Sequence, residues 1–142
     1  MSMFIDKSDY NASVHAEIID SVIRSDESLL DICENRAIEE MTSYLSGRYD
    51  CDALFAMRGE ERPQLVLMMC LDIAIYHIFC IHNPMKLSKM RESRYERAVE
   101  WLKAVQKGQL SIPGVPLAHA DDPSANRTPF VMKSNPKRNN YR

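Results

Sequence analysis

Three side chains of metal-binding type lie close together near the middle of the chain. His77, Cys80 and His82 form the pattern His-x-x-Cys-x-His. Residues three apart share a helix face, so His77 and Cys80 would lie together, with His82 pointing elsewhere unless the helix ends there. Zinc would need a fourth ligand, and neither Cys51 nor Cys70 stands at a recognised spacing. We expect no metal site, and interpret His77 as a largely buried imidazole bonded to a neighbouring polar group.

The cysteines could also supply a catalytic nucleophile. The chain has four, Cys33, Cys51, Cys70 and Cys80, with no Cys-x-x-Cys pair. A reactive thiol needs a lowered pKa and access, whereas the apolar run around Cys70 and Cys80 would raise the pKa. Free thiols that act as small core hydrophobes in a reducing compartment are the simpler interpretation. We predict neither an enzyme nor a cofactor.

A nucleic-acid site would need a basic patch on the folded body. The nearest candidate is the row Arg91, Arg94 and Arg97, which is matched by Glu92, Glu96 and Glu100. We interpret this row as an exposed helix face whose charges neutralise one another. The four glycines of the chain are scattered, so no glycine-rich phosphate loop is predicted.

The elements that must position these residues are helical by their pattern. Apolar residues at steps of three and four predict helices over Lys7–Arg24 and Glu27–Ser46, with Gly47 as the left-handed cap of the second. A later helix starts at Ser88 or at Ser93, which begins a capping-box pattern, and closes at Gly108. Together with the apolar helix described next, the pattern predicts an all-α domain of four to five helices.

The most apolar segment, Leu65–Ile81, is interrupted only by Asp72 and His77. A helix of this kind must be covered on most of its circumference. A membrane span is the competing interpretation, but the segment is at the short end of the spanning range and carries an acid near its middle. We predict a core helix in a protein without membrane contact, with Asp72 and Tyr76 as a local pair four residues apart.

Helical periodicity stops between residues 48 and 62. Long connections are commonly functional. One interpretation is an ordered loop that folds over the helix ends and plugs the core with its aromatic side chains. The other is a contact surface for a neighbouring subunit, because charged residues flank aromatic ones. For the second interpretation the candidate interface residues are Arg48, Tyr49, Asp50, Phe55, Arg58 and Arg62.

The end of the chain differs from the body in composition. We divide the chain into a helical domain, residues 1–117, whose last part is an extended arm, and an extended tail, residues 118–142, rich in Pro and Asn. The tail has five Lys and Arg against two Asp, a net +3, which leaves −5 for the body. Alone it buries too little apolar surface to offset the entropy of ordering, so we expect partner contacts to order it. Its candidate contact residues are Phe130, Met132, Lys133, Lys137 and Arg138.

Three strings in fixed order carry a family resemblance: YLSGRYD at Tyr44–Asp50, DIAIYHI at Asp72–Ile78 and RYERAVEWLKAVQKG at Arg94–Gly108. Together they resemble the head-to-tail connector proteins of tailed phages, the Mu-like prophage family of adaptor or joining proteins. The resemblance runs from about Phe4 to Leu117, and the tail departs from it.

The resemblance implies a structural protein rather than an enzyme. Proteins of this kind form a ring, commonly of about twelve copies, between the portal protein and the next neck or tail protein. The ring completes the head and extends the channel, through which DNA passes without specific binding. The implied place is the virion neck, after synthesis in the host cytoplasm. The matching strings imply a structural core that includes Tyr44, Leu45, Asp72, Tyr76, His77, Tyr95, Trp101 and Leu102.

A second hypothesis comes from a different class of protein. The same helices could form a cytosolic partner-binding or regulatory module that uses its last two helices as a hairpin. Such a module is expected to be a monomer or a two-fold dimer, whereas a connector forms or joins a high-order ring. Oligomeric behaviour therefore separates the two hypotheses.

Overall fold

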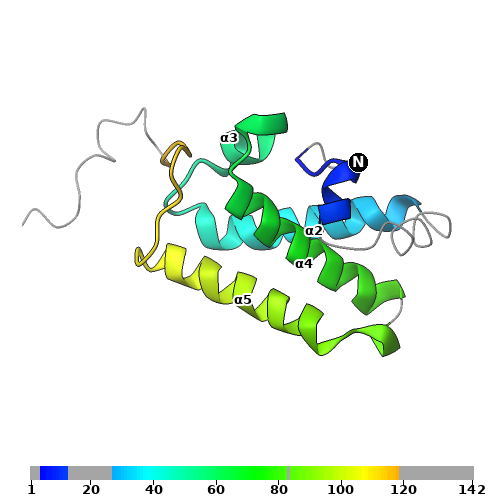
Figure 1. Cartoon of the computed structure of the whole chain (residues 1–142). Helices are drawn as coiled ribbons and strands as arrows, with labels where there is room; N and C mark the ends of the chain where they lie inside the picture. The colour runs from blue at the N-terminus through cyan, green and yellow to red at the C-terminus, as the bar shows by residue number, and fades with distance from the viewer. Residues whose placement is uncertain (1–3, 13–26, 83, 119–142) are drawn as a thin grey trace, which may run out of the picture.

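Three long helices dominate the computed structural model, which describes residues 4–12, 27–82 and 84–118. They are α2 (Glu27–Leu45), α4 (Gln64–His82) and α5 (Lys89–Gln106). The short α3 (Cys51–Ala56) lies at one end of them (Figure 1), and three 3-10 turns complete the list: η1 (Lys7–Ala12), η2 (Gly59–Glu61) and η3 (Pro84–Lys86). The all-α prediction is confirmed. Only the first six residues of the predicted helix Lys7–Arg24 are described, as η1, and residues 13–26 lie outside the described part.

Helix α4 is the core helix. It packs against both α2 and α5, and ten of its residues from Val66 to Ile78 are buried. By length and composition it is the one helix in the described part that could cross a membrane, but more than half of it is buried inside the fold. A core helix passes the same test, and its packing between two helices is what the apolar run Leu65–Ile81 predicted.

The helix ends decide between the two predicted starts of α5 and show that one expectation, the left-handed cap at Gly47, was wrong. The side chain of Ser88 caps α5 by accepting a hydrogen bond from the Arg91 amide at 3.3 Å, so Ser93 lies inside the helix. Gly108 closes α5 at φ 80°, and its amide donates to the Val105 carbonyl. Gly47 is not among the positive-φ glycines of the chain. There the chain leaves α2 through a turn, in which the Tyr49 amide still reaches the Leu45 carbonyl at 2.9 Å.

The connection between residues 48 and 62 is not one irregular loop, because it contains α3 and η2. The Asp50 carboxylate caps α3 by accepting from the Ala53 amide at 3.1 Å, while Cys51 and Leu54 point into the core. A six-residue helix spans fewer than two turns, which is too short to show a repeating apolar stripe. The connection is thus ordered and folded over the helix ends.

Candidate functional site

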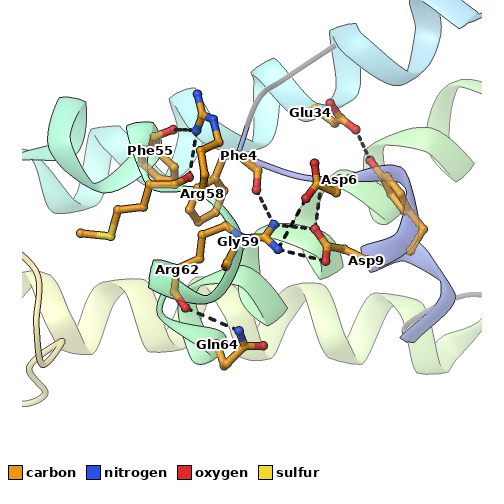
Figure 2. Close-up of polar contacts among 11 residues, drawn as sticks. Phe4, Asp6, Asp9, Glu34, Phe55, Arg58, Gly59, Arg62 and Gln64 are labelled. Carbon is orange, nitrogen blue, oxygen red and sulfur yellow. Dashed lines mark hydrogen bonds and ion pairs between the residues drawn. The ribbon is translucent and has the colours of Figure 1, made fainter.

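The first feature of the connection is a buried arginine that holds the start of the chain. The Arg62 guanidinium donates to Asp9 Oδ2 at 2.6 Å, Asp9 Oδ1 at 3.3 Å and the Phe4 carbonyl at 2.7 Å (Figure 2). Its Nε donates to the Gly59 carbonyl at 2.8 Å. Only 7 % of Arg62 is exposed, and the hydrogen bond to Asp9 raises its pKa further. Arg62 therefore ties the N-terminal segment to the beginning of α4.

Two other residues of the connection remain at the surface. Arg58 is exposed, and within the described residues it donates to carbonyls of its own segment, those of Phe55 at 3.2 Å and Met57 at 2.8 Å. The Phe55 ring is half-buried and meets Phe4 edge-on, with 5.1 Å between centroids. Figure 2 shows both side chains beside the Arg62 network. The exposed surface of both side chains is available to a partner.

The second feature is a clasp that fixes the C-terminal arm, residues 107–118. The Arg48 guanidinium donates to the carbonyls of Val105 and Leu110 near the end of α5. The negative end of the helix dipole also stabilises a cation there. The Tyr49 hydroxyl accepts from the Ile112 amide at 2.8 Å, and Tyr49 is 3 % exposed. Backbone bonds around the Tyr49–Leu117 bridge complete the clasp.

These contacts divide the six interface candidates of the connection. Arg48, Tyr49 and Arg62 are bonded to segments far away in the chain, which the pattern of the sequence did not reveal. Asp50, Phe55 and Arg58 keep exposed or half-exposed surface. A subunit contact through the connection stays a prediction, and the second group is the one that could make it.

A polar cluster joins the three long helices. Glu40 of α2 accepts from the Tyr95 hydroxyl at 2.6 Å and lies 3.0 Å from His77 Nε2. Tyr76 stacks on Tyr95 with 4.0 Å between ring centroids. Burial and the bond to Glu40 raise the pKa of Tyr95. His77 thus bonds a neighbouring polar group as predicted, although it is 23 % exposed rather than largely buried.

Asp72 is bonded across helices and not to Tyr76. Its side chain is 2 % exposed and accepts from Arg97 Nη2 of α5 at 2.8 Å, so the predicted local pair was wrong. A guanidinium is the stronger partner for a buried carboxylate. Burial still raises the pKa of Asp72, against the opposing effect of Arg97. Because Arg97 serves Asp72, the arginine row of α5 is not merely neutralised by glutamates of its own helix.

The remaining core candidates and the thiols lie where packing residues are expected. Leu45 and Leu102 are fully buried, Trp101 is nearly so, and Tyr44 packs half-buried against the core. All four cysteines are free, and three are buried. Burial raises the pKa of Cys33 to about 11, and raises those of Cys51 and Cys70 as well. Among the described residues no group of three or more His, Cys, Asp or Glu could hold a metal ion.

Comparison with known proteins decides the family. The model of the bacteriophage Mu Gp36 family matches residues 4–132. The chain belongs to the Mu Gp36 family. No curated protein and no solved structure gave a significant match.

The Mu Gp36 match corrects the extent of the resemblance. It continues past Leu117 to Met132, so most of the tail belongs to the family pattern rather than departing from it. Phe130 and Met132 fall inside the match, and Lys133, Lys137 and Arg138 fall beyond it. All five tail candidates lie outside the described residues.

Proposed function

We propose that this Mu Gp36 family protein is a structural virion component that forms a ring of about twelve copies between portal and tail. The ring completes the head, extends the DNA channel and catalyses no reaction. The observation that carries the proposal is the phage family match over residues 4–132. The ordered connection supports it, because a ring subunit needs a rigid surface to offer its neighbours.

Charge supports a channel through which DNA slides. The body carries −5 and the tail +3. Adhesion to DNA comes from cations that neutralise phosphates, so an acidic body favours passage without binding.

The proposed contacts use two surfaces. On the body, Asp50, Phe55 and Arg58 meet the neighbouring subunit. In the tail, Phe130 and Met132 provide apolar anchors, and Lys133, Lys137 and Arg138 meet acidic surface of the portal or of the adjacent subunit.

Electron microscopy of isolated virion necks, with the protein labelled, tests the proposal. The expected result is a ring of about twelve copies between portal and tail. Absence of the protein from necks, or its presence as one or two copies, would overturn the proposal. A monomer or two-fold dimer that is absent from virions would support the regulatory-module hypothesis instead.

The role of the tail has its own test. The Ala118 amide donates to the Arg48 carbonyl at 3.0 Å, so the truncation should begin at His119 to keep the clasp intact. Removal of residues 119–142 is expected to leave the helical domain folded and to weaken docking to the portal or to the adjacent subunit. If the truncated protein joins tails as well as the full chain does, the tail is not a docking element.

A further inference from the structure

A groove of about 490 Å³ lies where η1, α4 and α5 meet. Its floor is the apolar face of α4, one wall is η1, and the other wall is α5. The lining residues used below are Asp9, Leu67, Met68, Asp72, Arg94 and Arg97. The proposals above leave this groove unused.

The charges of the groove lining balance, two guanidinium groups against two carboxylates, but both carboxylates are already engaged. Each of its two carboxylates already has a guanidinium partner, Asp9 in Arg62 and Asp72 in Arg97. Arg97 is 51 % exposed and bonds Asp72 through Nη2 alone. Arg94 makes no hydrogen bond or ion pair within residues 4–12, 27–82 and 84–118, although its charge lowers the pKa of Asp72. Arg94, and the part of the Arg97 guanidinium that does not bond Asp72, can therefore bind a further carboxylate.

The floor of the groove extends onto exposed apolar surface. Met68 lines the groove and is 38 % exposed, and Leu65, one helical turn earlier, is 47 % exposed. An apolar floor beside a basic wall has the composition of a protein-binding surface. It fits an acidic segment that also presents a large apolar side chain.

The chain carries such a segment on another element. Residues 50–61, the α3–η2 segment, have exposed carboxylates and only Arg58 against them, a net charge of −3, and Phe55 half-buried among them. The exposed carboxylates are those of Asp50, Asp52, Glu60 and Glu61.

We propose that the groove of one copy binds the α3–η2 segment of a second copy, with Asp52 facing Arg94. The inference rests on the proposed ring and supplies the opposite half of its subunit contact. Groove and segment are different surfaces, so each copy uses its groove toward one neighbour and its segment toward the other. A head-to-tail contact of this kind closes into a ring when the rotation between copies permits. Charge complementarity between the two surfaces fixes their register.

Charge reversal on each side tests the contact. Arg94→Glu and Asp52→Arg are made separately in the full chain, and self-association is measured by sedimentation velocity over a concentration series at low ionic strength. Each variant alone is expected to associate about tenfold more weakly, because like charges would meet. An equimolar mixture should regain association, since each copy then offers the charge that the other requires. Arg36→Glu, the same change at an exposed position of α2, is the control.

The outcomes separate this inference from the ring proposal. Weakening by both variants, recovery in the mixture and an unaffected control support the groove contact. If the wild type associates and the variants associate equally well, the groove contact is wrong while the ring stands. A wild type that stays monomeric throughout also overturns the groove contact, and microscopy of necks then judges the ring. Circular dichroism of each variant shows whether a loss comes from unfolding.

Discussion

The three-helix core and the connection that crosses its end are stabilised by different physics. Apolar side chains fill the core between α2, α4 and α5, and its buried carboxylate Asp72 has a cross-helix guanidinium partner. The connection and the arm bury only a few apolar side chains, such as Leu54 and Ile112, and depend in addition on polar ones, above all Arg48, Tyr49 and Arg62. In the core, many apolar contacts each contribute a part of the stability, whereas in the connection and the arm single polar side chains contribute a large part of it.

The difference has a consequence for function. A spread of apolar contacts makes the core a scaffold whose shape changes little when one surface residue changes. The Arg62 network and the clasp of the arm determine where the N-terminal segment, the connection and the arm lie on that scaffold. Substitutions in the two regions should therefore have different effects. Those in the core should lower the stability of the whole domain, whereas those in the Arg62 network or the clasp should release one segment.

The largest expected effect is in the core. Leu102→Ala, at a fully buried position of α5, should lower the free energy of unfolding by about 2–5 kcal/mol, because it removes buried methyl groups and leaves a cavity. Urea denaturation measures the change. Leu110→Ala, at a position 45 % exposed, is the matched control and should stay within about 0.5 kcal/mol of the wild type. Equal losses in both variants would contradict the placement of the core.

Next comes the Arg62 network, which ties the N-terminal segment to the beginning of α4. Arg62→Ala should cost about 2 kcal/mol, since it leaves Asp9 and the Phe4 carbonyl without their charged donor. Hydrogen exchange should show faster exchange concentrated in residues 4–12. Arg58→Ala, which removes an exposed arginine of the same segment, should leave that exchange unchanged. Uniformly faster exchange over all helices would show that Arg62 supports the core instead.

A smaller effect is expected at the arm. Tyr49→Phe keeps the buried ring and removes the acceptor of the Ile112 amide, at a cost of about 1 kcal/mol. The Ile112 amide should exchange faster while amides within α4 keep their protection. No change at Ile112 would mean that the backbone bonds around Leu117 hold the arm without the tyrosine.

The smallest effect is a pH dependence from the core thiol Cys33. Burial raises its pKa from 9.0 to about 11, so in this range the unfolded chain releases a proton that the folded chain keeps. The free energy of unfolding therefore falls as pH rises, by about 0.8 kcal/mol at pH 9.5 for this group. Denaturation of wild type and Cys33→Ala at pH 8 and pH 9.5 should give a shallower fall in the variant. Identical slopes would refute a buried, protonated thiol.

The sequence by itself determined the long helices and the character of the core. Spacing of three and four placed α2 and α5 to within a few residues, and the apolar run Leu65–Ile81 identified the central helix α4. Gly108 marked the end of α5 correctly. These features follow from neighbours one or two turns apart, so the local pattern contains the information.

Only the tertiary structure decided the polar pairings and the short helix α3. Arg62 is bonded to Asp9, 53 residues away in the chain, and Tyr49 to Ile112, 63 residues away. Asp72 is bonded to Arg97 on another helix and not to Tyr76 on its own helix. No spacing encodes these choices, because which donor reaches a buried acceptor depends on how the helices are rotated and packed. The groove between η1, α4 and α5 has the same origin. Packing there pairs Asp9 with Arg62 and Asp72 with Arg97, so Arg94 has no hydrogen-bond or ion-pair partner in the described part of the chain.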